Sequence, residues 1–286
     1  MTKLILLNQK GLQQSIVEKL MDLYAFVDKK SYSSTCLEIH FANNFTNSEK
    51  KIIRDLCFEE QTDTIFLKET FKPLDIKLLA FDMDSTLINI ECIDEIARQC
   101  GKEKEVSNIT EATMRGEITD FAQALIERVK LLKGATENDL ETVYKHRLRL
   151  NPGAKNLILG AQQRGWNTLL VSGGFTYFTE RIKQLLSINE AYSNTLDIYN
   201  GLLTGQVLGP IVDGAAKAQF VRNSCSQLGV STQAAIVMGD GSNDLPMMEI
   251  AGLSIGYQPK PIVKEKADGT FQFVGLDAVL ELFMKK

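Results

Sequence analysis

The sequence predicts an α/β protein with a parallel central sheet, an inserted group of helices and a small α/β domain at the N-terminus. Three observations support this fold class. Short apolar runs at residues 76–81, 166–171 and 234–238 are typical of buried strands. Helical periodicity fills residues 92–150, between the first of these strands and the second. Residues 1–71 contain their own alternation of strand and helix patterns, which indicates a separate unit.

The N-terminal unit is expected to be a small α/β domain over residues 1–71. Its strands are predicted where apolar residues cluster or alternate, and its helices where they recur every three to four residues. Pro73 marks the end of the domain, because proline restricts the preceding residue to extended conformations and cannot continue a helix. The predicted strands are 4–7, 36–41 and 64–67, and the predicted helices are 12–24 and 48–58.

A second domain is expected over residues 76–286, with a helical cap inserted at about 92–150. Four helices with short polar connections follow the first strand of this domain. Asn151-Pro152-Gly153 closes the insertion and returns the chain to the sheet. Caps of this kind exclude water from a site and contribute substrate contacts. The predicted cap helices are 93–99, 102–114, 121–132 and 137–148.

The first predicted strand ends in a cluster of acids and hydroxyls. Asp82 and Asp84 follow residues 76–81 together with Ser85 and Thr86. Because strand side chains alternate, both carboxylates are expected on the same side, where they repel each other. Such a pair suits a bound cation or phosphate chemistry. An ordinary strand-to-turn junction also favours these residue types, so this motif alone leaves both interpretations open.

Two further strands end in residues that suit phosphate or metal binding. Residues 166–171 lead into Ser172-Gly173-Gly174, and residues 234–238 lead into residues 239–244, which contain two acids. The carboxyl ends of parallel strands lie at one edge of a sheet, where α/β proteins bind ligands. This convergence favours a reaction centre over a surface turn. The residues expected to meet there are Asp82, Asp84, Ser172 and Asp240.

Composition restricts the partners of such a centre. The net charge of −4 gives no general attraction for nucleic acid or an anionic membrane, and no apolar run reaches the ~20 residues of a membrane span. A phosphorylated small molecule must therefore be attracted by local groups. The five cysteines are odd in number and form no Cys-x-x-Cys pair, which predicts reduced, buried thiols in a cytoplasmic protein.

Four ordered motifs resemble those of the haloacid dehalogenase superfamily of phosphotransferases. They are residues 81–86, residues 172–174, Lys217 and residues 239–244. The resemblance runs from about Leu78 to the C-terminus. It implies a Rossmann-like parallel sheet core and a reaction at a phosphate group. Lys217 by itself could be a solvated lysine at a helix start, and its place between the second and third motifs favours the functional interpretation.

Within that superfamily the chain resembles the phosphoserine phosphatases. Between Gly116 and Phe121 it is one residue longer than their pattern. These phosphatases often carry ACT-like N-terminal domains, and the predicted order of elements in residues 1–71 is similar but shortened. The segments that carry the resemblance are residues 89–97, 114–116, 128–134 and 171–175.

The chemistry of phosphate-monoester hydrolysis assigns roles to the acids. Asp82 is predicted to be the nucleophile, which forms an aspartyl-phosphate. Asp84 is predicted to protonate the serine oxygen and later to deprotonate the attacking water. Mg²⁺ suits hard oxygen ligands, and the resemblance implies Asp82, the main-chain carbonyl of Asp84, and Asp240 as its protein ligands.

Other residues are predicted to hold the phosphoryl oxygens. Ser172, the Gly173 backbone N–H and Lys217 are expected to contact them and to stabilise their developing charge. Asp244 is expected to orient Lys217 or a metal-bound water from behind. Asn243 is expected to contact the substrate.

Cap residues are predicted to select an amino acid. A free amino acid presents an ammonium and a carboxylate, which require an acidic and a basic partner. Glu91 and Arg128 match the family positions with these two roles, although solvated cap charges would explain them without the surrounding motifs. Met114 and Phe121 could wall the pocket or belong to the cap core.

The resemblance therefore implies a Mg²⁺-dependent phosphatase that converts O-phospho-L-serine to L-serine in the last step of serine biosynthesis. Two alternatives stay open at this point. A phosphotransferase would use the same residues and pass the phosphoryl group to a second alcohol such as homoserine. An amino-acid sensor without catalysis would use the extra N-terminal domain, but the intact acids and Lys217 argue against it. A homodimer is compatible with the sequence.

Overall fold

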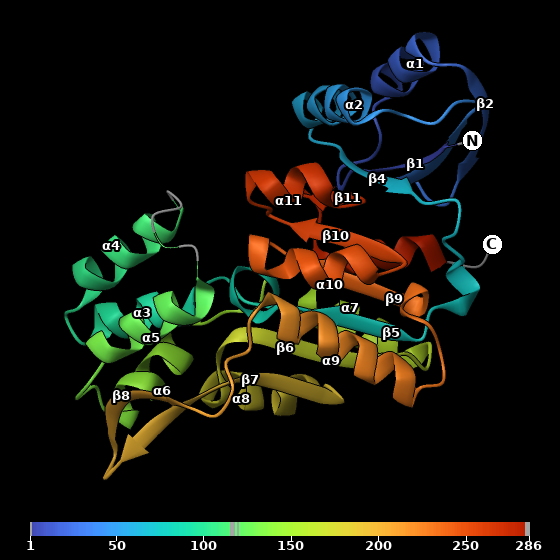
Figure 1. Ribbon diagram of the computed structural model, residues 1–286. Helices are drawn as coiled ribbons and strands as arrows, with labels where there is room; N and C mark the ends of the chain where they lie inside the picture. The colour runs from blue at the N-terminus through green and yellow to red at the C-terminus, as the bar shows by residue number, and fades with distance from the viewer. Residues whose placement is uncertain (1, 115–117, 119, 284–286) are drawn as a thin grey trace.

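The computed structural model describes residues 2–114, 118 and 120–283, without the side chains of Glu111, Thr113 and Met114 (Figure 1). In this part of the chain the strands join in one mixed sheet of eleven strands. They are β1 (Thr2–Leu7), β2 (Phe26–Ser31), β3 (Cys36–Phe41), β4 (Asp63–Leu67), β5 (Leu78–Phe81), β6 (Asn167–Phe175), β7 (Glu190–Tyr199), β8 (Leu202–Leu208), β9 (Ala235–Gly239), β10 (Leu253–Tyr257) and β11 (Gly269–Phe271). Their order is β2-β3-β1-β4-β11-β10-β9-β5-β6-β7-β8.

The core of the second domain is the parallel part of this sheet, from β11 to β7. Alternate residues of β5 point to opposite faces, so Leu79 and Phe81 pack with one layer of helices while Leu78 and Ala80 pack with the other. The first layer is α7 (Ala154–Gln163), α8 (Thr176–Leu186) and η6 (Leu276–Phe283). The second is α9 (Gly214–Gln227), α10 (Leu245–Ile250) and α11 (Pro261–Lys266). This confirms the predicted α/β fold with helices on both faces of the sheet (Figure 1).

The three predicted core strands are confirmed as β5, β6 and β9, which lie side by side. Their other ends lie within two residues of the prediction, and the largest difference is at the end of β6. β6 does not end at Val171 but continues to Phe175, and its register against β7 shifts between these two residues. The irregularity falls at residues 172–174. Backbone groups of these residues are therefore not all used in pairing with β7 and can point toward the carboxyl ends of the parallel strands.

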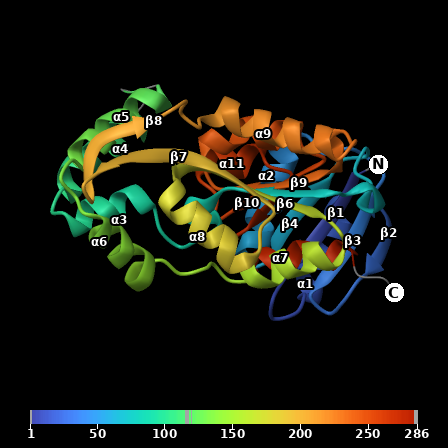
Figure 2. The same cartoon turned by 90° about the horizontal axis from the view of Figure 1, so that it is seen from below.

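The insertion after β5 forms a group of helices apart from the sheet. It consists of α3 (Cys92–Gln99), α4 (Glu103–Met114), α5 (Phe121–Leu131), α6 (Glu137–Thr142) and η3 (Val143–Arg147). The fourth predicted helix is thus divided, with a π-helical turn at its end. The long β7–β8 hairpin, which the sequence did not predict, reaches the same group of helices (Figure 2). Leu203 on β8 pairs through its backbone with Gly134 and Ala135 at 2.9 and 2.8 Å.

The N-terminal domain has the order β1-α1-β2-β3-α2-β4, with α1 (Gln14–Leu23) and α2 (Asn47–Glu59) on one face of its antiparallel strands. This order is the complete β-α-β-β-α-β arrangement, the split β-α-β fold. The sequence predicted only three of its four strands. The missing strand is β2, whose six residues are all exposed and include Asp28, Lys29 and Lys30. Charged residues protect such an edge strand but leave no apolar pattern to detect. The likeness to an ACT domain stays a prediction.

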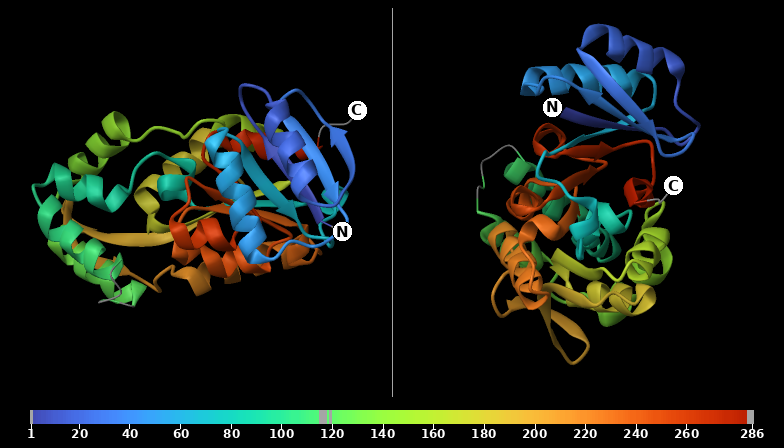
Figure 3. Two further views of the ribbon diagram at one scale, coloured as in Figure 1. Left: turned by 90° about the horizontal axis from the view of Figure 1, so that it is seen from above. Right: turned by 90° about the vertical axis from the view of Figure 1, so that its right-hand side faces the viewer.

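The two domains share the sheet rather than merely touching. β4 of the N-terminal domain pairs antiparallel with β11, with Ile65 opposite Gly269 and Thr64 opposite Thr270 (Figure 3). Beside this pairing the buried carboxylate of Asp63 accepts hydrogen bonds from the backbone N–H groups of residues 272–274 at 2.8–2.9 Å. The sheet therefore continues across the domain boundary near Pro73.

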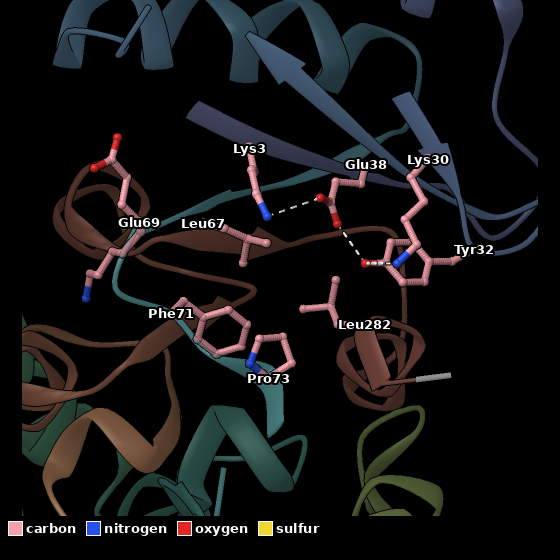
Figure 4. Close-up of a pocket in the computed structure, with 10 residues that line it drawn as sticks. Lys3, Lys30, Tyr32, Glu38, Leu67, Glu69, Phe71, Pro73 and Leu282 are labelled. Atoms are coloured by element: carbon pink, nitrogen blue, oxygen red, sulfur yellow. Dashed lines mark hydrogen bonds and ion pairs between the residues drawn. The ribbon is translucent and has the colours of Figure 1, made fainter. Parts of the chain in front are cut away.

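A cavity opens at the same junction, below the sheet face that carries Lys3 and Glu38 (Figure 4). Phe71 and Leu282 form its apolar wall. Glu38 accepts a hydrogen bond from Tyr32 Oη at 2.7 Å, and Lys3 Nζ lies 3.7 Å from its carboxylate. The buried acid of this cavity is thus already partnered by the protein.

Candidate active site

The first acid motif leaves β5 in a single π-helical turn, η2 (Met83–Leu87). Within it Asp84 keeps an extended backbone with ψ 135°, and Ser85 takes the left-handed conformation with φ 56°. Left-handed backbone is unusual for a residue other than glycine and is concentrated at functional sites. The turn buries both carboxylates, with Asp82 4% and Asp84 8% exposed. Asp84 Oδ1 accepts a long hydrogen bond from the Cys92 backbone N–H at 3.4 Å.

A fully buried lysine joins the first and last motifs. Lys217 Nζ, on α9, lies 2.8 Å from Asp82 Oδ1 and donates to Asp244 Oδ1 at 2.7 Å. The other oxygen of Asp244 accepts from the backbone N–H groups of Asp240 and Gly241, both at 3.0 Å. Both oxygens of Asp244 are therefore occupied by the protein, and this carboxylate fixes the lysine and the acidic loop together.

The acidic loop brings a third carboxylate to the site. Oxygens of Asp82, Asp240 and Asp244 lie within 4.8 Å of one another. A side chain at Gly239 would stand 2.5 Å from the Asp244 carboxylate, so glycine is required for this close approach. Since Asp244 is already engaged, Asp82 and Asp240 have the oxygens that a hard cation could take, and their buried charges fit Mg²⁺.

The second motif, residues 172–174, lies close to Asp84 at the carboxyl ends of the parallel strands. Ser172 Oγ is fully buried and accepts from the Gly174 backbone N–H at 2.8 Å. A Cβ atom at Gly174 would lie 2.6 Å from Asp84 Oδ2 and 3.1 Å from Ser172 Oγ, so the missing side chain lets these two groups approach. Asn194 on β7 donates to the Gly173 carbonyl and accepts from Val212 N–H, each at 2.8 Å, and so holds this loop in place.

Two of the predicted cap residues approach the same edge. Glu91 Oε1 accepts a hydrogen bond from Ser85 Oγ at 2.7 Å, which ties the start of α3 to the acid motif. The Phe121 ring lies over Gly173, where an added Cβ would come within 2.9 Å of its Cζ atom. The cap therefore covers the site, and Phe121 forms part of its wall.

Other predicted residues have looser surroundings. Arg128, on α5, donates from Nε to the Ala124 carbonyl at 3.2 Å. Asn243 is half-buried beside Gly241, where an added Cβ would meet its Oδ1 at 2.7 Å. The side chain of Met114 and residues 115–117 lie outside the described residues, so the prediction for Met114 is not placed.

Burial and crowded negative charge set the pKa values of the acids. Burial, and then repulsion from Glu91, raises the pKa of Asp84 to about 8. Burial also raises the pKa of Asp240 to about 6, although Lys260 opposes the rise. The pKa of Asp82 is raised by burial against the opposing pull of Lys217. Burial lowers the pKa of Lys217, but Asp244 and Asp82 outweigh it and the net direction is upward.

The structure adds residues that sequence reasoning missed. Lys260 Nζ lies 3.2 Å from Asp240 Oδ2, and Thr86 Oγ1 lies 3.5 Å from Asp240 Oδ1. Asn194 belongs to a strand that was not predicted. The clearest local signal was for Thr86, which was part of the first motif, whereas the proximity of Lys260 and Asn194 arises only from the tertiary fold.

Comparison with known proteins agrees with this geometry. The sequence profile of the haloacid dehalogenase-like hydrolases matches residues 79–249. Phosphoserine phosphatases of Polaromonas sp. and Albidiferax ferrireducens are 53% and 51% identical over 212 and 213 residues, which is 73% of this chain and 90% of each relative.

Solved structures show the same likeness. A haloacid dehalogenase family hydrolase of Salmonella enterica superposes with a TM-score of 0.87 at 30% identity, and the match covers 100% of this chain and 99% of that one. A phospho-aspartyl intermediate analogue of phosphoserine phosphatase gives a TM-score of 0.67 at 38% identity, over 73% of this chain and 99% of that one. The chain belongs to the haloacid dehalogenase-like hydrolase family.

In the part of the chain that the structure describes, no helix is long and apolar enough to cross a membrane.

Proposed function

We propose that the protein hydrolyses O-phospho-L-serine to L-serine and inorganic phosphate, the last step of serine biosynthesis. The observation that carries this proposal is the placement of Asp82 beside the fully buried Lys217 and of Asp84 beside Ser172 and Gly174, under a cap that supplies Glu91 and Arg128. The high identity to phosphoserine phosphatases over the same part of the chain supports it.

The phosphoryl group is transferred first to Asp82. One carboxylate oxygen attacks phosphorus, the bond from phosphorus to the serine oxygen breaks, and an aspartyl-phosphate forms. Lys217, the Ser172 hydroxyl and the Gly173 backbone N–H hold the equatorial oxygens. Because Lys217 is fixed by Asp244 before substrate arrives, its charge is already oriented for the transition state.

Asp84 acts as the general acid in the first step and as the general base in the second. Its raised pKa keeps the carboxyl protonated near neutral pH, so it can donate to the departing serine oxygen. The resulting carboxylate then takes a proton from the water that attacks the aspartyl-phosphate, which releases phosphate and restores both acids. The close approach of Asp84 to Ser172, permitted by Gly174, places it beside the phosphoryl site.

The acid cluster is suited to Mg²⁺, held by Asp82, the Asp84 carbonyl and Asp240. When bound, this ion would neutralise charge on the phosphoryl oxygens. Two features of the chain favour such a site. The carboxylates lie within 4.8 Å of one another, and burial raises their pKa values, which a cation would counteract.

The cap completes substrate selection. Glu91 takes the ammonium group and Arg128 the carboxylate of phosphoserine, while Phe121 and the rest of residues 92–150 exclude water. Five free cysteines and a net charge of −4 suit action in the reducing cytoplasm on a small molecule. Four of these cysteines are buried as predicted, and Cys100 is half-buried.

Phosphate release from O-phospho-L-serine tests the proposal. We expect strong preference for phosphoserine over a phosphosugar and an aryl phosphate, and loss of activity when EDTA removes Mg²⁺. Equal rates on all three substrates would contradict the amino-acid selection while leaving the Asp82 chemistry intact. Release of serine without phosphate when homoserine is added, with phosphohomoserine as product, would instead identify a phosphotransferase.

A further inference from the structure

One half-buried carboxylate of the cap has no role in the proposed chemistry. Asp94 lies on α3, one turn after Glu91 and on the same face of the helix. Its Oδ1 atom is buried and has no hydrogen-bond partner among the described residues. A buried polar atom without a partner is costly, so its persistence points to a partner in another state of the protein.

The local structure does not explain this acid. An acid at the third helical position usually reaches back to the backbone at the start of its own helix, but no such bond is present on α3. The adjacent acid, Glu95, is by contrast well paired, with Arg98 and Arg147 each at 2.8 Å. Helix α3 therefore satisfies Glu95 and leaves one oxygen of Asp94 without a hydrogen-bond partner among the described residues.

Among the cations around Asp94, Arg128 has the largest effect on the pKa of this carboxyl, ahead of Arg98. Helices α3 and α5 are in contact, and Ile93, beside Asp94, belongs to the same buried apolar cluster as Leu125 and Val129 around Arg128. Burial lowers the pKa of Arg128, and Asp94 opposes this more strongly than Glu91 or Asp84 does. The only hydrogen bond that the structure gives Arg128 among the described residues uses Nε, so its two terminal amino groups are available.

We propose that Asp94 is a positioning residue that holds the Arg128 guanidinium when Arg128 binds the carboxylate of the substrate. Arg128 can donate from one edge to Asp94 and from the other to the substrate, because a guanidinium has five donors in a fixed plane. The orphaned Oδ1 then gains its partner only in the substrate complex. Since that oxygen is buried, a protein cation reaches it more readily than the ammonium of an entering ligand. This inference rests on the proposed function.

Three substrates separate the possible roles of Asp94. O-phospho-L-serine has both charged groups, phosphoethanolamine lacks the carboxylate, and 3-phosphooxypropanoate lacks the ammonium. For Asp94→Asn we expect kcat/KM to fall about tenfold on the two substrates with a carboxylate, mainly through KM. Phosphoethanolamine should be hydrolysed as by the wild type, and Asp94→Glu should restore part of the loss.

Controls separate a positioning role from a structural one. Glu95→Gln, on the same helix, should leave kcat/KM for all three substrates within about twofold of the wild type. In an Arg128→Ala background, Asp94→Asn should cause no further loss, because the group it positions is absent. Circular dichroism and the melting temperature of each variant report whether it is folded.

Several outcomes would overturn the inference. A selective loss on the two substrates with an ammonium would make Asp94 an ammonium ligand. An equal loss on all three, or no loss, would exclude a role in positioning Arg128. Wild-type enzyme that treats the three substrates alike would overturn the proposed function as well, whereas wild-type discrimination that Asp94→Asn leaves unchanged would overturn only this inference.

Discussion

The two halves of the site differ in how completely their charges are paired. In the core half Lys217, Asp244 and the backbone of Asp240 and Gly241 form a closed network with every distance between 2.7 and 3.0 Å. In the cap half Arg128 bonds only its own helix among the described residues, and Asp94 has a buried oxygen without a partner. The core is thus prepared for the phosphoryl group, which every substrate of this chemistry shares. Under the proposed function, Glu91 and Arg128 of the cap bind the part of the substrate that distinguishes one monoester from another.

The largest effects should follow from substitutions that disable one half at a time. Asp82→Asn should lower kcat/KM by about 10⁴-fold or more on every phosphate monoester, because the nucleophile is gone. Arg128→Ala should lower kcat/KM for phosphoserine by about 10²-fold and leave an aryl phosphate nearly unaffected. Steady-state kinetics on both substrates measures this. Full turnover by Asp82→Asn would disprove the covalent mechanism, and comparable losses on both substrates with Arg128→Ala would remove the division into halves.

Stability should reveal the closed charge network of the core half. Among the described residues, Lys217 is the only cation within 4.0 Å of the buried carboxylates of Asp82 and Asp244, so Lys217→Met should lower the free energy of unfolding by about 3–5 kcal/mol. Lys266→Met provides a matched control, because Lys266 is half-exposed and lies 4.0 Å from Glu249. Its effect should stay within about 0.5 kcal/mol. Urea denaturation of both variants gives the comparison, and similar values would mean that the buried network contributes little to the fold.

A smaller effect should appear in the pH dependence of the reaction. Asp84 must be protonated to act as the acid, and its pKa is raised to about 8 by burial and by Glu91. The kcat/KM should therefore fall as the pH rises through about 8. Glu91→Gln removes the repulsion and should move this alkaline limb to lower pH. A limb that does not move in Glu91→Gln would show that the cap charge has no influence on the acid of the core.

The same division explains what could be predicted from the sequence. Asp82, Asp84, Ser172 and Asp240 were predicted to converge because each follows an apolar strand, and the ends of parallel strands meet by the geometry of the sheet. The structure brings them together. Their turn was not predicted, since the left-handed Ser85 replaces the simple alternation of a strand.

Residues placed by long-range contacts were not predictable in this way. Asn194 and Lys260 reach the site from a strand and a helix start whose sequences contain no signal for it. Strand β2 was missed because its exposed residues have no apolar periodicity. Asp94 could not be singled out from the sequence. Only the structure shows that its Oδ1 atom is buried without a hydrogen-bond partner among the described residues.

The pairing of β4 with β11 has a consequence for any shortened form of the protein. Removal of the residues before Pro73 would not release an independent domain but would uncover the backbone of β11 as a new free edge. The deletion would take Phe71 with it and so would also uncover the apolar surface around Phe283, against which the Phe71 ring packs. Such an edge invites pairing with other chains, so aggregation, rather than altered catalysis, is the first property to examine in a truncated protein.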